Sequence, residues 1–484
     1  MAYIQGENRE QLTLMPMCLD DYIEPNNICR VIATFVNNLD LLELGFKYAK
    51  TKTSGRPSYN PARMLMLYIY GYMNRIRSSR RLDAEARRNV EVMWLMEKLT
   101  PDDKTISNFR KDNAKALKNV FRIFNYWCNN NDLFGKELLA IDGTKIRANC
   151  SWKNIFTLDS ANKGLEKINQ NINRYMDDLA SNDSTECEEE QPNSDAVAKV
   201  LENLNNKKVK LTELISELEK GEFNEISTVD PDARIMRQGG DARARDACYN
   251  VRTVVDSKYK LIVDFETSTC ANDIATLSRP AKSAKEILGV NEISVVADSG
   301  FYDGADADRC KENNITCFIA KLKRGTKAPS EKYNHSNFKY DKINDTYTCP
   351  QEVILPFKYT KKVKELVRRI YGNIDACRAC SCRDLCTSQK RGWREVQRNP
   401  HQDAEDEVDA RMATLEGRRI MSERKKLVEH PYGTIKKIWG YGCFLCRGLE
   451  KTTGEASLIL LAYNLRRVAN IFTKNPIDLI NMLT

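Results

Sequence analysis

The segment Glu137-Leu-Leu-Ala-Ile-Asp142-Gly143 decides how the rest of the chain is interpreted. It is a short apolar run that ends in an acid and a glycine, which is typical of a buried strand. Ile293-Ser-Val-Val-Ala-Asp298 repeats this form, and Ile315-Thr-Cys-Phe-Ile-Ala320 predicts another strand. Two further strand candidates lie between Ala247 and Glu266, and a helical pattern follows from about Asp273 to Leu288.

The order of these segments predicts an α/β (α+β) architecture with a ribonuclease-H-like core. In that fold a strand ending in Asp is followed by two strands, a helix, a second strand ending in Asp, a helix, a strand and a later helix with Glu. The two strand ends lie beside each other, and the helix brings the third acid alongside them. Three carboxylates that converge in this way form a site for two hard cations, Mg²⁺ or Mn²⁺, which serve in-line phosphoryl transfer.

The local sequence identifies the two aspartates of this site more clearly than the glutamate. Asp142 and Asp298 each end an apolar strand, with glycine one or two positions later. A single Asp at a strand end is more often a turn former or a helix cap, and Asp264 in Leu261-Ile-Val-Asp-Phe265 is a rival. For the third acid, three glutamates compete on position: Glu429, Glu450 and Glu455. Spacing leaves that choice open.

The charge of the chain is concentrated near its start. The 484 residues carry a net charge of +9, and from Lys52 to Arg122 the sequence has 16 Lys or Arg against 7 Asp or Glu. Residues 1–130 read as short helices, and four arginines stand within seven positions: Arg75, Arg77, Arg80 and Arg81. A helical cluster with such a face suits DNA, whose phosphates attract it, while the alternative is a solvated basic surface.

No apolar run approaches the length needed to cross a bilayer, and the start has neither the basic nor the apolar part of a signal peptide. We therefore expect a cytoplasmic protein that has no contact with membranes. In the cytosol its 16 cysteines should be thiols or metal ligands.

Two helical periodicities, Leu165 to Leu179 and Val197 to Leu218, predict an antiparallel hairpin inserted at residues 160–222. The acidic stretch Ser181 to Asp195 would link its helices.

A second insertion carries closely spaced cysteines. Cys377-x-x-Cys380 has the spacing of a zinc knuckle, and Cys349 and Cys386 complete a set of four thiolates for a structural Zn²⁺, with Cys382 to spare. The alternative is a group of free thiols. Thiolates are too soft for the catalytic cation, and with only three histidines in the chain, carboxylates must hold that metal. Basic segments 358–369 and 390–398 flank the cysteines, so this lobe is a second candidate for DNA contact.

Two tryptophans are candidates for stacking on a DNA base, Trp393 beside Arg391 and Arg394, and Trp152 near Asp142. A tryptophan is more often an anchor of the core or its rim.

Ten segments occur in the order seen in one enzyme family. They are Gly55-Arg-Pro-Ser-Tyr59, Tyr68-Ile-Tyr-Gly-Tyr72, Ser78-Ser-Arg-Arg-Leu82, Thr105-Ile-Ser-Asn-Phe-Arg110, Ala140-Ile-Asp-Gly-Thr-Lys145, Asp230-Pro-Asp-Ala-Arg234, Tyr249-Asn-Val-Arg252, Ala297-Asp-Ser-Gly-Phe-Tyr302, Val428-Glu-His-Pro-Tyr-Gly-Thr-Ile-Lys436 and Tyr463-Asn-Leu-Arg-Arg467. Along nearly its whole length the chain thus resembles bacterial insertion-sequence DDE transposases with an InsH-like helical N-terminal domain.

The resemblance implies that Asp142, Asp298 and Glu429 are the catalytic, metal-holding acids. It also implies that Lys436 grips a DNA phosphate, seven residues after Glu429 and nearly on the same helical face. The family pattern usually has Arg four residues before the Glu, where this chain has Lys425 beside Arg424. It more commonly has Lys between the second Asp and Gly, where this chain has Ser299.

The function implied by the resemblance is binding of the inverted-repeat ends of an element, metal-dependent strand cleavage and transfer to target DNA. Two ends require a homodimer or a larger assembly on DNA, in the bacterial cytoplasm and on the nucleoid. The alternatives are a DNA nuclease of the same fold without strand joining, and a catalytically inactive, domesticated DNA-binding protein.

The expected domains are a helical DNA-binding domain (1–130), the first part of the catalytic domain (136–320), the Cys-rich lobe (321–420) and the C-terminal helices with the third acid (421–484).

Overall fold

The computed structural model describes residues 18–50, 57–183, 194–221, 224–238, 244–321, 328–363, 366–472 and 476–483. The chain divides into two compact units. The first unit comprises residues 1–135, 143–271 and 429–484, and the second comprises 136–142 and 272–428. The beginning of one quoted segment, Gly55-Arg56, and most of the predicted acidic linker 181–195 lie outside the described residues.

The first unit begins with short helices, as predicted. They are η1 (Leu19–Tyr22), α1 (Ile28–Asn37), α2 (Pro61–Met73), α3 (Ser79–Arg88), α4 (Val90–Leu95), α5 (Asp103–Asp112) and α6 (Ala114–Asn130). Asn60 caps α2 by accepting a hydrogen bond from the backbone N–H of Ala62, and Pro61 occupies the first turn, where its missing N–H costs nothing. Because α2 is buried on nearly all sides, it forms the centre of this helical domain.

Helix α15 (Leu449–Ile471) packs against α2, α5 and α6, and α16 (Pro476–Leu483) contacts α1. The approach of α15 to α6 is close enough to require glycine, since a Cβ on Gly454 would lie 2.6 Å from the Cα of Ala114. The next residue, Glu455, is fully buried. The C-terminal helix therefore belongs to the same core as the N-terminal helices.

The buried carboxylate of Glu455 is satisfied on all sides. It accepts hydrogen bonds from the backbone N–H groups of Leu445 (2.9 Å) and Cys446 (2.8 Å) and from the Tyr72 hydroxyl (3.2 Å). The Arg77 guanidinium lies 3.7 Å away. A carboxylate with this many donors is held for structural reasons.

The central sheet has the strand order β4-β5-β1-β7-β8, with β6 paired to β5. Its strands are β1 (Leu138–Arg147), β4 (Arg234–Arg237), β5 (Arg245–Asp256), β6 (Ile262–Ser268), β7 (Ile293–Ala297) and β8 (Ile315–Ile319). β4, β5 and β6 pair in antiparallel fashion, whereas β1, β7 and β8 are parallel. The order β6-β5-β1-β7-β8 is that of a ribonuclease-H-like fold, which confirms the predicted fold class.

β1 passes from the second unit to the first between Asp142 and Gly143. The residues before this point are buried on both faces of the sheet, because Leu139, Ala140 and Ile141 are all 0% exposed. Strands buried on both faces read as continuous apolar runs, so the sequence identified β1 and β7 without an alternating pattern.

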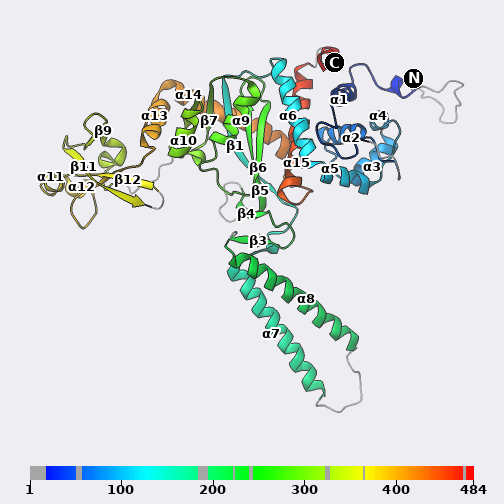
Figure 1. Cartoon of the computed structure of the whole chain (residues 1–484), viewed down its shortest axis with the longest axis horizontal. Helices are drawn as coiled ribbons and strands as arrows, with labels where there is room; N and C mark the ends of the chain where they lie inside the picture. The colour runs from blue at the N-terminus through cyan, green and yellow to red at the C-terminus, as the bar shows by residue number, and fades with distance from the viewer. Residues whose placement is uncertain are drawn as a thin grey trace, which may run out of the picture. The chain divides into compact units, whose positions relative to one another are not determined.

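In the first unit, α7 (Leu158–Asp183) and α8 (Ser194–Glu219) form the predicted hairpin (Figure 1). Beside the hairpin stand η2 (Trp152–Asn154) and a two-stranded sheet, β2 (Ile155–Thr157) and β3 (Glu225–Ser227). A small core lies at this end of the hairpin and contains Ala161, Leu211, Leu214, Ile215, Leu218 and Ile226. The hairpin is thus fastened to its unit at one end.

The second unit adds helices to the parallel strands: α9 (Ser278–Leu288), η3 (Ser299–Phe301), α10 (Gly304–Glu312), α13 (Gln402–Ala413) and α14 (Leu415–Tyr432), whose last turn belongs to the first unit. α9, α10 and α13 all contact β8. No helix among the described residues is both long and apolar enough to span a membrane.

The Cys-rich lobe of the second unit is built on a separate sheet (Figure 1). Its order is β13-β12-β11-β10-β9. The elements are η4 (Glu331–Tyr333), η5 (His335–Asn337), β9 (Lys339–Asp341), β10 (Thr346–Thr348), β11 (Ile354–Val363), β12 (Leu366–Tyr371), α11 (Ile374–Arg378), α12 (Arg383–Cys386) and β13 (Val396–Arg398). Its core consists of Phe338, Tyr347, Leu355, Tyr371 and Val396.

Replacing Glu455 with Ala should destabilise the first unit by about 3–5 kcal/mol, because Arg77 and two backbone N–H groups lose a buried partner. Urea unfolding followed by tryptophan fluorescence measures this change. The matched control is Glu450→Ala, which alters an exposed glutamate of the same helix and should change stability by less than about 0.5 kcal/mol. Equal stability of the two variants would contradict the structural role assigned to Glu455.

Candidate functional site

Two of the predicted acids, Asp142 and Asp298, lie next to each other in the second unit. β1 and β7 pair in parallel with Ile141 opposite Ala297, so the next residue of each strand is an aspartate. Neighbouring strands are about 4.8 Å apart. Both aspartates are half-buried. Asp298 follows the end of β7, whereas Asp142 lies within β1, which continues to Arg147, so the predicted strand end at Asp142 is wrong. The sheet therefore places two carboxylates beside each other on its central strands.

Asp298 is fixed by the turn that follows it. Its Oδ1 accepts a hydrogen bond of 2.8 Å from the backbone N–H of Gly300 and so caps η3. A Cβ at position 300 would lie only 2.9 Å from the same oxygen, which explains the glycine in Asp298-Ser-Gly. The capping role and the proposed metal-holding role are compatible, because a carboxylate has two oxygens and several lone pairs.

Asp142 is paired with an arginine. Nη1 of Arg424, on α14, lies 3.2 Å from Oδ2 of Asp142, and the two side chains are 17% and 22% exposed. Because both side chains are largely buried, the guanidinium balances the charge of the carboxylate more effectively than it would at a fully exposed position. Sequence reasoning noticed Arg424 only as the neighbour of Lys425, which is exposed. The pairing of Arg424 with Asp142 required the structure.

Glu429 lies in the last turn of α14, in the first unit, and is exposed. The residue after it is anchored, since Nδ1 of His430 lies 2.9 Å from the Tyr463 hydroxyl. The Tyr432 hydroxyl is likewise 2.8 Å from the Thr253 hydroxyl. Burial, with Arg467 and Lys260 nearby, lowers the pKa of His430, so this contact is made by a neutral ring. Glu429 thus stands on a fixed backbone.

The α-helix that carries Glu429 ends at Tyr432. Residues Gly433–Ile438 form a π-helical turn, η6, and the N–H of Trp439 donates to the carbonyl of Thr434, five residues earlier. The predicted common face of Glu429 and Lys436 assumed an unbroken α-helix, and that premise is wrong. The wider turn changes the angle between successive side chains, so seven residues no longer make two turns.

Lys436 points instead to the strand that carries the first acid. Its Nζ donates to the Thr144 hydroxyl (3.1 Å) and to the carbonyl of Lys145 (2.7 Å), both just after Asp142 on β1. Burial lowers the pKa of Lys436, and Lys145 adds to the effect against an opposing influence of Cys248. The first unit therefore places an amine beside Thr144 and Lys145 of β1.

The alternative acids from the sequence analysis lie elsewhere in the structure. Asp264 is buried on β6, and β5 separates that strand from β1. Glu455 is enclosed by the donors described above. Glu450 is exposed at the start of α15, with its Oε1 4.0 Å from Nζ of Lys115. Of the three candidate glutamates, Glu429 alone combines exposure with a place beside a basic segment of α14.

The predicted DNA-contacting arginines separate into two groups. Three are exposed: Arg75, Arg80 and Arg81. Arg77 instead donates to the carbonyl of Cys443 (2.6 Å) and stands 4.5 Å over the ring of Tyr441, beside Glu455. The Arg77 guanidinium is therefore enclosed in the interior of the first unit. Arg75, Arg80 and Arg81 stay exposed, and Arg80 also pairs with Asp103 at 3.4 Å.

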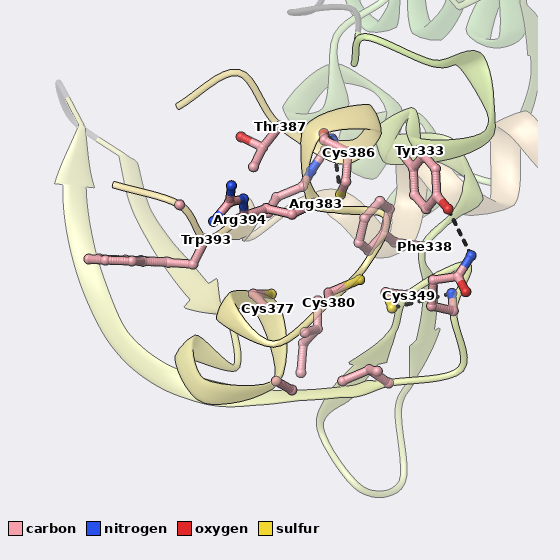
Figure 2. Close-up of a pocket in the computed structure, with 15 residues that line it drawn as sticks. Tyr333, Phe338, Cys349, Cys377, Cys380, Arg383, Cys386, Thr387, Trp393 and Arg394 are labelled. Atoms are coloured by element: carbon pink, nitrogen blue, oxygen red, sulfur yellow. Dashed lines mark hydrogen bonds between the residues drawn. The ribbon is translucent and has the colours of Figure 1, made fainter. Parts of the chain in front are cut away.

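The four cysteines predicted to bind zinc, Cys349, Cys377, Cys380 and Cys386, line one cavity (Figure 2). The backbone N–H of Gln351 donates to the sulfur of Cys349 at 3.4 Å, and a turn closes from Cys377 to Cys380. Cys382, the predicted spare, is not among the residues that line the cavity. The lobe thus gathers the expected four thiols and leaves out the fifth.

Among the described residues, no three His, Cys, Asp or Glu side chains are grouped closely enough to share a metal ion. In the cavity, burial raises the pKa of the Cys386 thiol, with Arg394 opposing and Cys377 and Cys349 adding to the rise. A metal would have to deprotonate these thiols and draw their side chains together.

Of the two tryptophans, Trp393 is held by its own lobe. The guanidinium carbons of Arg378 and Arg391 lie 5.0 Å and 5.5 Å from the centre of its ring. Trp152 is 53% exposed. The surface of Trp152 is therefore the more accessible one for a base.

The strand order and the two neighbouring aspartates are those of a ribonuclease-H-like core. Two family descriptions match the chain: Transposase domain (DUF772) over residues 17–112 and Transposase DDE domain over residues 348–469. The chain thus carries a transposase domain and a DDE transposase domain, which support a DNA transposase of the insertion-sequence DDE type. DDE transposases generally use divalent metal ions.

Other comparisons add little. No curated protein matches the sequence. The chain is similar to the piggyBac transposase in its synaptic complex with hairpin DNA, solved by cryo-EM, at 10% identity and a TM-score of 0.33. The likeness covers 94% of this chain and 78% of the other, and it is too weak to carry an argument about function.

Replacing Arg424 with Ala should strengthen the binding of Mn²⁺ to the DNA-free protein by about two- to fivefold, because Asp142 loses the counter-ion with which a cation competes. Isothermal titration calorimetry measures this affinity. Lys425→Ala removes an exposed charge at the adjacent position and should leave it unchanged. Unchanged or weaker Mn²⁺ binding by the Arg424 variant would show that the ion pair does not compete with the metal.

Proposed function

We propose that this transposase binds the inverted-repeat ends of its element, cleaves DNA there in a reaction that needs Mg²⁺ or Mn²⁺, and joins the freed 3′ end to target DNA. One observation carries the proposal: the register of β1 and β7, which makes Asp142 and Asp298 the next residues on adjacent parallel strands. Half-buried carboxylates are hard oxygen donors, which suit these cations.

In this proposal Asp142, Asp298 and Glu429 hold the cations. When bound, the cations activate the attacking oxygen and stabilise the leaving oxygen. Arg424 would neutralise Asp142 in the metal-free protein. Lys436, beside Thr144 and Lys145, and the exposed Lys425 would contact phosphates next to the scissile bond.

The N-terminal helical domain is proposed to bind the element end. The exposed Arg75, Arg80 and Arg81 lie on and just before α3, where they can reach a phosphate backbone, while Arg77 holds that segment to the interior. Because an element has two ends, we propose that at least two copies assemble on DNA, in the bacterial cytoplasm.

The isosteric variants Asp142→Asn, Asp298→Asn and Glu429→Gln should each lower cleavage of a labelled element end in Mg²⁺ by at least about a hundredfold, since each loses a charged metal ligand. Gel analysis of a duplex that carries the inverted repeat measures cleavage and joining together. Glu450→Gln, at the exposed rival, should cleave normally.

If the three variants cleave as well as the unchanged chain, the assignment of the acids is wrong. Cleavage without joined product would favour a nuclease, and binding without cleavage by the unchanged chain would favour an inactive DNA-binding protein.

We further propose that the four cysteines of the cavity bind one structural Zn²⁺. Four thiols around one cavity, two of them on a short turn, provide the soft donors and the number that zinc needs. Thiolate binding would pull the turn at Cys349 and the helices α11 and α12 together. The metal would thereby stabilise a lobe whose own core is small.

Purified protein should contain about one zinc per chain, and the double variant Cys377→Ser/Cys380→Ser should contain almost none. Metal content is measured by plasma mass spectrometry after dialysis. Cys382→Ser is the control, because it changes a thiol of the same segment outside the cavity and should keep the zinc. Equal zinc in both variants, or none in the unchanged chain, would contradict the proposal.

A further inference from the structure

The strands β11 and β12 extend beyond their neighbours in the sheet of the Cys-rich lobe. β10 pairs with β11 only at Ile354–Pro356, and β13 pairs with β12 only at Arg369–Tyr371. The remaining residues, 361–363 of β11 and 366–368 of β12, pair only with each other. We call these residues the ribbon; they form the far part of the long hairpin seen in Figure 1.

The ribbon is exposed and basic. From Ile354 to Tyr371 the sequence has six Lys or Arg and one Glu. In the ribbon, Lys361 and Lys362 are exposed, and Val367 is 50% exposed. An exposed two-stranded ribbon has little packing of its own, so its residues are not selected to fill a core.

The charges on the ribbon destabilise the pairing of its two strands. Lys361 is directly opposite Arg368 across the strands. Like charges in directly opposed positions repel and destabilise a strand pair. A ribbon that is to stand alone in water would carry opposite charges there. The repulsion is relieved when a polyanion binds.

Few acids balance this charge. Arg369, at the base of the ribbon, pairs with Asp345, and Arg368 donates to the side-chain carbonyl of Gln397 (3.1 Å). Within the described part of the chain, no carboxylate pairs with Lys361 or Lys362. The two lysines are therefore available to an external anion.

We propose that the ribbon binds duplex DNA by entering a groove, with its lysines on the phosphates that border it; this inference rests on the proposed function. Side chains alternate between the faces of a strand, so Lys361 and Arg368 lie on one face and Lys362 on the other. A groove has a phosphate backbone on each side, and the major groove of B-form DNA, about 12 Å wide, admits a two-stranded ribbon. Exposed Leu366 and Val367 meet base edges or sugars.

The salt dependence of DNA binding tests the ribbon directly. Binding of the full chain to a fluorescent duplex carrying the element end is measured by anisotropy without added Mg²⁺ or Mn²⁺, at a series of KCl concentrations. Each lysine that neutralises a phosphate contributes about 0.9 to the slope of log K against log [KCl], so K361A/K362A should make the slope shallower by about 2. K361R/K362R keeps both charges and should keep the slope.

The control K207A/K208A removes two adjacent exposed lysines from α8 and should leave the slope unchanged. An unchanged slope for K361A/K362A would overturn the proposal. So would an RNA duplex of the same length that binds more tightly than DNA with the same dependence on the ribbon, because it would assign the surface to RNA.

The test is independent of catalysis, because no Mg²⁺ or Mn²⁺ is added and the proposed structural zinc is left in place. A ribbon effect that persists in the Asp142→Asn variant supports the DNA surface whether or not Asp142 proves catalytic. If the ribbon has no effect while the acid variants lose cleavage, the ribbon proposal alone fails.

Discussion

The parallel pairing of β1 with β7 is the constraint on which the site depends. Side chains alternate along a strand, so a slip of one residue would turn Asp142 to the opposite face of the sheet. The residues before the two aspartates prevent this slip, because Ile141 and Ala297 are opposite each other and both fully buried. The hydrophobic core thus sets the relative position of two carboxylates that contribute nothing to it. Apolar packing sets the register of the two strands, and each aspartate is the first residue after the packed positions.

Two adjacent carboxylates repel each other, and the second unit offsets this cost with local partners. Asp142 has the Arg424 guanidinium at 3.2 Å, and Asp298 has the Gly300 N–H at 2.8 Å. Neither partner encloses its acid, since both aspartates keep some exposure. A fully enclosed acid such as Glu455 has lost its capacity for further ligands. The contrast separates a carboxylate held for stability from one that can exchange a partner for a cation.

The local part of this arrangement could be predicted from the sequence, and the tertiary part could not. Buried strands appear as apolar runs and the hairpin as a helical periodicity, because both patterns depend on near neighbours in the chain. The four arginines from Arg75 to Arg81 form one basic cluster in the sequence, yet the structure turns Arg77 inward to Cys443. Burial sets Glu455 apart from Glu429 and Glu450, and spacing does not contain that information. The pair Arg424–Asp142 joins residues far apart in sequence, so no local pattern predicts it.

The end of α14 shows why spacing alone could not select Glu429 as the proposed third acid. Pro431 lies inside the helix and lacks the N–H that an α-helix uses there. The chain then changes to the π turn η6, and π turns occur frequently at functional sites. His430 and Tyr432 fasten this irregular segment to Tyr463 and Thr253 through side-chain contacts. A metal-holding acid must be exposed and also fixed in direction. Anchoring the residues around Glu429, rather than Glu429 itself, satisfies both requirements, and it leaves no signal in the periodicity of the sequence.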